Sequence, residues 1–512
     1  MLELQATCAI EKLIQYAVEN QLLDELDHEY ARNLLLDMMQ MDSPAESAEL
    51  DRAEIYPTAT PILNELCSIA VQKGIIEDLG YARELFSTRL ISAVTPSPKE
   101  VRRQFAENYA ISPEKATSDF YTMCQKTDYV KIDAIKQNIR YFADTPVGEL
   151  EITINLSKPE KDPKEIAKLK NAPSVGYPRC MLCKENPGYA GRSNFPARQN
   201  HRIIPLNLNG QDWFLQYSPY AYYSEHCIVF NKNHVPMKVD RGSIERLFSF
   251  TEQFPHYLIG SNADLPIVGG SILNHDHFQG GQYSFPMEKA TSLIRLTTPF
   301  EDVQASILNW PMTTISLCGK NKLAIIELSD QVLKAWREWT DEACDIYANT
   351  EETPHNTITP ILRKIGDGWR LNLVLRNNRT DDENPLGIFH PHNPLHHIKK
   401  ENIGLIEVMG LFILPGRLKY EFAQLEDYLT GEKPLCMPLD TDPVYKHFAW
   451  VSDIVKKYGY CKNHEEAQDV LRKETALVCA QVLIDSGVYK LNDNGIAGIL
   501  RFTGSLGMHR AD

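Results

Sequence analysis

The spacing of apolar residues changes near position 145, and this change divides the chain into regions of different secondary structure. Before it, apolar residues recur at intervals of three and four, as in Ile10, Leu13, Ile14 and Ala17, which is the spacing of one helix face. After it, residues 149–156 alternate acidic or polar with apolar side chains, which predicts a β-strand. The chain is therefore expected to begin with a helical region and to continue with a sheet.

Two helix starts in the first 145 residues carry N-terminal capping signals. Residues 97–100 (Ser-Pro-Lys-Glu) and 112–114 (Ser-Pro-Glu) combine a serine cap, a proline in the first turn and an early acid. Residues 129–141 are expected to close this helical region. The charged stretch 158–164 is typical of a solvated linker.

Short strands and helices alternate beyond the linker. Strands are expected at 213–217, 227–230, 267–273, 323–328 and 369–375, and helices at 243–256, 331–349, 402–413 and 464–486. Antiparallel strands interrupted by helices, with a helical region at each end of the chain, predict an α+β fold.

The charge balance excludes one class of partner. Lys and Arg number 53 and Asp and Glu 68, for a net charge of −15, so the chain as a whole repels nucleic acids. No apolar stretch is long enough for a membrane span, and the N-terminus lacks a secretory signal. Eleven thinly spread cysteines do not resemble a disulfide framework. We expect a cytoplasmic protein without membrane or nucleic-acid partners.

The densest chemistry lies in residues 264–281, Asp-Leu-Pro-Ile-Val-Gly-Gly-Ser-Ile-Leu-Asn-His-Asp-His-Phe-Gln-Gly-Gly. On an extended segment, His275, His277 and Gln279 share one face. Glycine pairs on both sides leave backbone amides open to the close approach of a phosphate. A neutral imidazole attacks phosphorus well, and Gln279 offers an amide donor without a titratable proton. The pattern favours transfer of the group over hydrolysis.

A local basic segment could neutralise a diphosphate. Between positions 179 and 202 lie five cations and one acid, a net of +4, and arginine binds phosphate in a bidentate manner. Arg198 and Arg202 rank first because they flank Asn200-His201 just before an expected strand. A solvated basic loop is the alternative.

Four histidines gather between positions 390 and 397, and His390-Pro391-His392 faintly echoes the pair at 275 and 277. No glutamine follows, so a second nucleophile is not expected. His390, His392 and the neighbouring Lys399 are candidate sugar-phosphate contacts, with a surface cluster as the alternative.

Residues 264–281 resemble the signature of the second family of galactose-1-phosphate uridylyltransferases, within the histidine-triad superfamily. The match is nearly continuous, with Asn274 where Ser or Ala is expected. Segments 176–180, 216–227 and 387–392 support the resemblance, which extends through most of the chain.

The resemblance implies a duplicated histidine-triad-like antiparallel sheet core between helical ends. On this basis the chain is divided into a helical N-terminal domain (1–145), a first half that carries the nucleophile (146–298), a second half (299–420) and a helical C-terminal region (421–512).

The resemblance also implies ping-pong transfer of a uridylyl group from UDP-glucose to galactose 1-phosphate, giving UDP-galactose and glucose 1-phosphate. His277 would be the nucleophile and Gln279 would bond the transferring phosphoryl oxygens. Ser271 with the amides of Gly269 and Gly270 would hold the adjacent phosphate, and Asn262 would help to position substrate.

A structural zinc site is expected from Cys180, Cys183, His234 and His275, a closed set of two thiolates and two imidazoles. Cys180 and Cys183 form the only cysteine pair at metal-ligand or redox spacing. His226 competes with His234 as the third ligand, and two reduced buried cysteines would show the same pattern. No organic cofactor is expected.

Three alternatives stay open at this stage. A dinucleoside-polyphosphate phosphorylase uses similar chemistry, an N-acetylhexosamine 1-phosphate could be the acceptor, and a silent zinc- or nucleotide-binding scaffold would carry the same motifs. The oligomeric state is also open, with a homodimer as one candidate.

Overall fold

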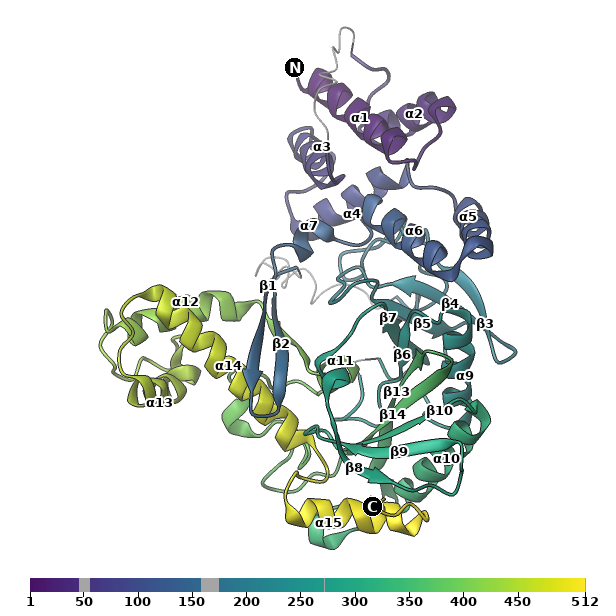
Figure 1. Ribbon diagram of the computed structural model, residues 1–512. Helices are drawn as coiled ribbons and strands as arrows, with labels where there is room; N and C mark the ends of the chain where they lie inside the picture. The colour runs from purple at the N-terminus through teal and green to yellow at the C-terminus, as the bar shows by residue number, and fades with distance from the viewer. Residues whose placement is uncertain (46–55, 158–174, 271, 512) are drawn as a thin grey trace. The chain divides into compact units, whose positions relative to one another are not determined.

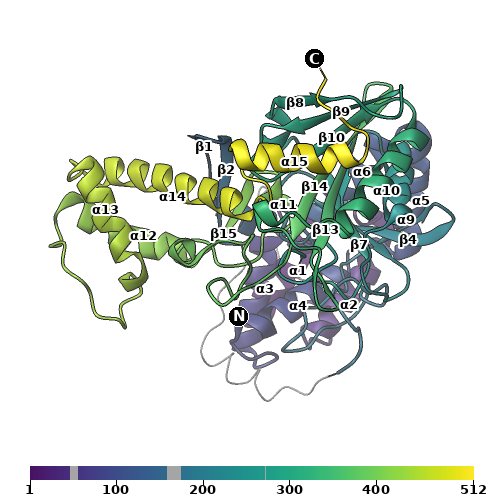
Figure 2. The ribbon, with the colours of Figure 1, turned by 90° about the horizontal axis from the view of Figure 1, so that it is seen from below.

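The computed structural model describes residues 1–45, 56–157, 175–270 and 272–511, so the expected linker at 158–164 lies outside the described residues. The chain forms two compact units. The first consists of Met1–Gln137 and Ser157–Val235, and the second of Asn138–Leu156 and Pro236–Asp512. Figure 1 and Figure 2 show the elements of each unit.

The first unit begins with helices, as the apolar spacing predicts. Their buried stripe includes Ile10, Leu13 and Ile14 of the first helix, which no solvent reaches. The predicted caps are confirmed: Ser97 Oγ accepts from the Glu100 amide at 3.2 Å and Ser112 Oγ from the Lys115 amide at 3.1 Å. The helices are α1 (Leu2–Glu19), α2 (His28–Met38), α3 (Thr60–Gln72), α4 (Gly80–Ser92), α5 (Pro98–Ile111), α6 (Pro113–Lys126) and α7 (Ile132–Ile135).

The same unit contains an antiparallel meander of three strands. It consists of β3 (Ile204–Leu208), β4 (Gln211–Tyr217) and β5 (Cys227–Asn231). The strands expected at 213–217 and 227–230 are confirmed. Trp213, Leu215 and Tyr217 alternate into the core and are fully buried.

The second unit is built on strands with the order β7-β6-β13-β14-β10-β9-β8, every neighbouring pair antiparallel. Helices α9 (Arg241–Gln253) and α10 (Lys322–Arg337) pack against its central strands. The strands are β6 (Leu258–Gly260), β7 (His277–Gly281), β8 (Ser292–Leu296), β9 (Val303–Leu308), β10 (Thr314–Gly319), β13 (Asn356–Ile365) and β14 (Gly368–Asn377).

The order of elements along the chain repeats once. A meander (β3, β4, β5), a helix (α9) and an antiparallel pair (β6, β7) are followed by a second meander (β8, β9, β10), a second helix (α10) and a second pair (β13, β14). Strands β6 and β13 are neighbours, so the two repeats meet within the second unit. The α+β prediction with a duplicated antiparallel core is confirmed, whereas the division into four regions stays a prediction.

Beside this sheet, the second unit contains a three-stranded sheet and the C-terminal helices. Strand β1 (Ile139–Thr145) pairs antiparallel with β2 (Gly148–Asn155), and β15 (Leu411–Pro415) pairs parallel with β2. Two short strands, β11 (Asn349–Thr350) and β12 (Thr353–Pro354), form a separate pair. The remaining helices are α11 (Leu405–Val408), α12 (Arg417–Thr430), α13 (Phe448–Tyr458), α14 (His464–Ser486) and α15 (Asp493–Ser505). No helix in the described part of the chain has both the length and the apolar content to cross a membrane.

Several sequence predictions are wrong. The segment 129–141, expected to close the helical region, contains only the short helix α7, and its last residues already belong to β1, which pairs with β2. The strand expected at 323–328 lies inside α10, whose start is capped by Asn321 Oδ1 accepting from the Ala324 amide at 3.2 Å. A short apolar run fits a buried helix as well as a strand. The helix expected at 331–349 ends at Arg337.

Two further predictions, at 402–413 and 267–273, are also wrong. The helix expected at 402–413 is the short α11 followed by β15, and Gly410 with φ +91° turns the chain between them. Residues 267–270 do not form the expected strand, because Ile267 has φ +71°, which no strand contains.

Candidate active site

Strand β7 begins at His277 and positions the central chemical groups. Because side chains alternate along a strand, His277 and Gln279 project from the same face. His277 is 5% exposed, Gln279 is partly exposed and the preceding His275 is fully buried. The structure therefore places an imidazole and an amide next to each other on one face.

The hydrogen bonding of His277 leaves one ring nitrogen with its lone pair free. Its Nδ1 lies 2.8 Å from the backbone oxygen of His275, so Nδ1–H donates to that carbonyl and the lone pair resides on Nε2. Burial lowers the pKa of His277 to about 4, opposed by the bond to the His275 carbonyl. The ring is neutral near pH 7, the form that can attack an electrophile.

A glycine paired with Gln279 allows Pro360 on β13 and Leu405 on α11 to approach the sheet closely. Gly260 on β6 pairs with Gln279, and a β-carbon at this position would lie 2.9 Å from Leu405 Cδ1 and from the Pro360 oxygen. Glycine is therefore needed for α11 to pack directly on the sheet beside Gln279.

The Gly269-Gly270 pair is held by close contacts. A β-carbon on Gly269 would lie 2.6 Å from the Ala263 oxygen, and one on Gly270 would lie 2.7 Å from Asn262 Nδ2. Asn262 Oδ1 accepts from the Leu405 amide at 2.9 Å. Asn262 thus joins the glycine pair to α11. Ser271 lies outside the described residues.

A buried carboxylate between the two histidines has no role in the sequence prediction. Asp276 Oδ2 lies 3.8 Å from Arg246 Nη2 on α9. Burial raises the pKa of Asp276 to about 6, and the Arg246 charge opposes this shift. This ion pair connects the residue before β7 to α9.

The two arginines chosen from the basic segment have different environments. Arg202 is 6% exposed and its guanidinium donates to the backbone oxygens of Pro96 (2.8 Å), Gln199 (2.8 Å), His201 (2.9 Å) and Thr95 (3.5 Å). Burial lowers the pKa of Arg202 to about 10. These contacts make Arg202 a structural group of the first unit.

Arg198 is the more open of the pair. Its guanidinium carbon lies 5.7 Å from the centre of the Tyr129 ring, and its Nη2 lies 4.0 Å from Met181 Sδ. Its Nε is buried without a hydrogen-bond partner among the described residues, and such a donor costs about 1–3 kcal/mol. Arg198 retains donors for an anion.

Three of the four expected metal ligands gather in the first unit. Cys180 Sγ lies 3.6 Å from Cys183 Sγ, which lies 3.2 Å from His234 Nδ1. Asn186 Nδ2 donates to the backbone oxygens of Cys180 (2.9 Å) and Cys183 (2.7 Å) and fixes the turn between them.

The competing His226 is stacked on the ring of Tyr222 and lies against the tilted ring of Tyr223. Cys180, Cys183, His234 and His275 make up a possible metal-binding group, and this donor set is compatible with zinc. The distances within the first unit also suit bond lengths of about 2.0 to 2.3 Å around one ion.

The histidine cluster is bonded largely to its own loop. His390 Nδ1 lies 3.3 Å from the Pro391 oxygen, His392 Nε2 lies 3.1 Å from the Ile388 oxygen, and His396 Nε2 lies 2.7 Å from the Pro391 oxygen. Burial lowers the pKa of His390. These bonds give the cluster a role in shaping the loop.

Lys399 is buried and ion-paired. Its Nζ lies 3.0 Å from Glu407 Oε1 and 3.8 Å from Glu401 Oε2. The charge of Glu407 raises the pKa of Lys399, against the effect of burial. The paired ammonium contributes to the structure of the loop before α11.

One buried arginine was missed by the sequence analysis. Arg376 on β14 is 1% exposed; its Nη2 donates to the Ile403 oxygen at 2.9 Å and its Nη1 to Thr359 Oγ1 at 3.4 Å. Its Nε has no hydrogen-bond partner in the described part of the chain, and burial lowers its pKa to about 10. A cation directly after the mostly apolar run at 371–375 was the available signal.

Comparison with known proteins gives concordant results. Residues 21–236 match the family described as galactose-1-phosphate uridyl transferase, N-terminal domain, and residues 250–435 match its C-terminal domain. The chain is 46% identical over 519 residues to a galactose-1-phosphate uridylyltransferase of Caldanaerobacter subterraneus subsp. tengcongensis, with 100% of each chain covered. It is 47% identical over 502 residues to one of Halalkalibacterium halodurans, covering 97% of this chain and 98% of the other.

Among solved structures, the yeast Ap4A phosphorylase Apa2 is 14% identical, with a TM-score of 0.32, covering 68% of this chain and 98% of that chain.

Proposed function

This chain belongs to the galactose-1-phosphate uridyl transferase family, and on that premise we propose that its reaction passes through a covalent uridylyl group on His277. The enzyme transfers a uridylyl group from UDP-glucose to galactose 1-phosphate and yields UDP-galactose and glucose 1-phosphate. The observation that carries the proposal is the Nδ1 hydrogen bond of His277, which leaves the lone pair on Nε2.

In the first half-reaction, Nε2 of His277 attacks the α-phosphorus of UDP-glucose. The bond from this phosphorus to the bridging oxygen breaks, and glucose 1-phosphate leaves with the electron pair. The product is a phosphoramidate whose ring carries a positive charge. The His275 carbonyl, which accepts from Nδ1–H, stabilises that charge.

In the second half-reaction, a phosphate oxygen of galactose 1-phosphate attacks the same phosphorus and the bond to Nε2 breaks. His277 returns to its neutral form with its Nδ1 proton in place. Neither step needs a proton to enter or leave, because the leaving and attacking groups are both ionised phosphates. This chemistry suits Gln279, which can donate a hydrogen bond but has no proton that titrates near neutrality.

The substrate contacts that we propose lie around β7. The amides of Gly269 and Gly270 bind the phosphate next to the transferred one, Asn262 holds α11 against this pair, and Arg198 contacts the diphosphate. Ser271, His390, His392 and Lys399 remain candidates for the sugar phosphate, of which Lys399 would act through the loop that it orders.

We also propose that His275 completes a zinc site with Cys180, Cys183 and His234. Bound zinc would supply a fixed crosslink and no chemistry of its own, because four protein ligands close the tetrahedral site. The ring of His275 would then be fixed while its carbonyl orients the ring of His277. Such a group outside the reacting atoms controls their orientation.

The location proposed for this enzyme is the cytoplasm. No disulfide joins the eleven cysteines, all of which lie in the described part of the chain. A reducing compartment suits such a chain.

The direct test of the proposed intermediate uses UDP-glucose labelled at the α-phosphorus. A label that stays on the protein in base and is released by acid is expected, as for a phosphoramidate. Adding galactose 1-phosphate should transfer the label to UDP-galactose. Full activity without a labelled protein would contradict the covalent route.

Replacing Gln279 by alanine is expected to slow uridylyl transfer by roughly ten- to a thousandfold, the range for one lost preorganised donor. Gln279→His should raise the ratio of UDP-glucose hydrolysis to transfer, because imidazole can act as an acid or base toward water. Steady-state transfer and release of glucose 1-phosphate without acceptor measure both effects. Gln282→Ala, exposed just beyond β7, is the control. An unchanged ratio in Gln279→His would show that water is excluded by other means.

A further inference from the structure

The segment that leads into the Gly269-Gly270 pair contains a strained turn. Ile267 has φ +71°, and the Val268 amide donates to the Pro266 oxygen at 2.8 Å. These features define a three-residue γ-turn of the rare, positive-φ kind. For a β-branched residue this conformation is an outlier, and such strain persists only where the surroundings impose it.

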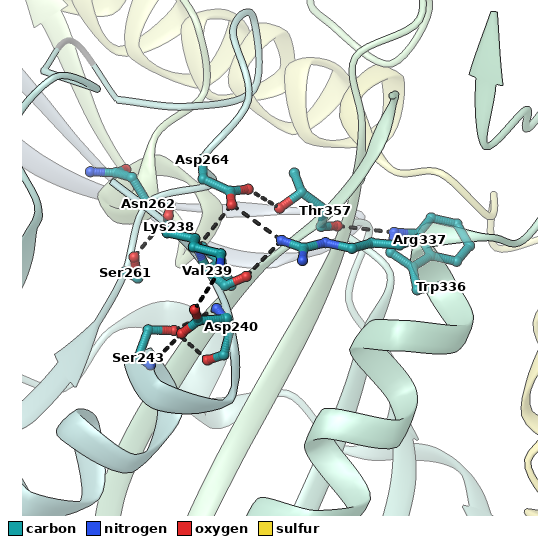
Figure 3. A network of polar contacts seen from close by, with 10 residues as sticks. All are labelled: Lys238, Val239, Asp240, Ser243, Ser261, Asn262, Asp264, Trp336, Arg337 and Thr357. Atoms are coloured by element: carbon teal, nitrogen blue, oxygen red, sulfur yellow. Dashed lines mark hydrogen bonds and ion pairs between the residues drawn. The ribbon is translucent and has the colours of Figure 1, made fainter. Parts of the chain in front are cut away.

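One carboxylate at the start of this segment joins three separate elements. Asp264 Oδ2 accepts from the Val239 amide at 2.8 Å and from Arg337 Nη2 at 3.2 Å, and Oδ1 accepts from Thr357 Oγ1 at 2.6 Å. Figure 3 shows these contacts. The side chain is 10% exposed. Asp264 thereby ties the turn to the start of α9, the end of α10 and the start of β13.

The partners of Asp264 also hydrogen-bond to one another. Arg337 Nη2 also donates to the Val239 oxygen at 2.6 Å, so one nitrogen serves both acceptors. The neighbouring Asp240 caps α9 by accepting from the Ser243 amide at 2.9 Å. This bond also fixes the backbone next to Val239. Asp264, the residue that anchors the turn, is therefore held rigidly.

The far end of the turn is fixed by contacts of its own. Gly269 forms a bridge with Ala263, and a β-carbon on Gly269 would lie 2.7 Å from the Leu265 oxygen. Asn378 Nδ2 donates to the Pro266 oxygen at 3.3 Å. Both ends of the turn are therefore held by contacts outside it.

We infer that Asp264 is a positioning residue: its contacts hold the Ile267 turn in its strained form and so pre-arrange the Gly269 and Gly270 amides for phosphate. This inference rests on the proposed function, in which those amides bind the phosphate next to the transferred one. Donors that are fixed before the reaction stabilise charge without reorganising. Relaxation of the turn would rotate the peptide planes that follow Ile267.

In a ping-pong reaction, one phosphate site serves both half-reactions. The phosphate of glucose 1-phosphate leaves from the place that the phosphate of galactose 1-phosphate later enters. A defect in the amide pair should therefore slow both half-reactions by a similar factor. A loss of folded enzyme would instead lower the number of active sites and leave the rate per site unchanged.

The first test separates backbone strain from side-chain loss at position 267. Ile267→Ala and Ile267→Gly both remove the side chain that approaches Gly387, but only glycine removes the steric cost of the positive φ and lets the backbone at position 267 move freely between positive and negative φ. The glycine variant is expected to unfold at the same or a higher temperature than the alanine variant. It should nevertheless exchange label between UDP-glucose and glucose 1-phosphate about tenfold more slowly. A glycine variant that equals or exceeds the alanine variant in exchange would overturn the inference.

The second test changes Asp264 itself. Asp264→Asn keeps the size of the side chain but replaces one acceptor oxygen by an amide donor, and we expect both half-reactions to slow about tenfold or more per labelled histidine. Asp341→Asn is the matched control, because Asp341 is also buried and paired with an arginine, Arg501, at 2.8 Å. The control should keep its rate per labelled site. Normal rates per site in Asp264→Asn would assign Asp264 a structural role alone.

Failure of the proposed function can be told apart from failure of this inference. Wild-type enzyme that exchanges label without forming the covalent intermediate would contradict the role of His277. The comparison of the glycine and alanine variants would then be made on exchange rates alone, and it would still decide whether the strained turn matters.

Discussion

Replacing His277 by glycine is expected to abolish the exchange of label between UDP-glucose and glucose 1-phosphate, a loss of at least roughly a thousandfold. That exchange needs only the nucleophile and its leaving group, so no other side chain can substitute for the missing Nε2. The rate is measured as radiolabel from glucose 1-phosphate that appears in UDP-glucose. The same variant should take up no acid-labile label from UDP-glucose.

The control for this result is a histidine outside the site. His464 lies at the start of α14, where it contacts Glu426 and Glu432, and His464→Asn should keep wild-type exchange. Because glycine also weakens a strand, His277→Asn is measured beside it and its melting temperature recorded. Near-normal exchange in either folded His277 variant would remove this residue from the covalent mechanism.

Purified enzyme is expected to contain about one zinc per chain, and Cys183→Ser should lose the metal and lower the melting temperature by about 10 °C or more. The reason is that a metal bound only by the folded chain adds its binding free energy to the stability of the fold. Metal content by mass spectrometry and thermal unfolding are measured on the same sample. Cys124→Ser removes another buried thiol of the first unit, and it should retain the metal.

The third ligand is tested by a pair of histidine variants. His234→Asn should lose the metal, since His234 Nδ1 lies 3.2 Å from Cys183 Sγ. His226→Asn should retain it, since the ring of His226 packs against two tyrosine rings, Tyr222 and Tyr223, and is not among the grouped ligand atoms. Metal-free enzyme with full activity and an unchanged melting temperature would refute the site.

The sequence predicted well those elements whose signals are local. Helix α14 runs from His464 to Ser486 as expected, and the serine caps of α5 and α6 bond to amides three residues away. A cap or a helical stripe depends on neighbours within one or two turns, and those neighbours are visible in the sequence. The shared face of His277 and Gln279 has the same origin, because it follows from the period of two in a strand.

Elements decided by distant partners were predicted poorly. Residues 411–413 were expected to be helical, but they pair with β2, more than 250 positions earlier in the chain. Residues 323–328 have an apolar pattern that suits either state, and their packing against β10, β13 and β14 as part of α10 decides the outcome. Local preference is weaker than the burial that a partner provides.

The sequence by itself determined the chemistry that we propose for this protein, because the proposed nucleophile, its amide neighbour and the two glycines lie within eleven consecutive positions. Only the tertiary structure decided which charged groups remain available to substrate. Arg202 donates to four backbone oxygens and Lys399 pairs with Glu407, whereas Asp264 gathers partners from positions 239, 337 and 357. A buried polar group is stable only when it is hydrogen-bonded or ion-paired. Its partners come from distant parts of the chain, and the spacing of residues in the sequence does not reveal which ones they are.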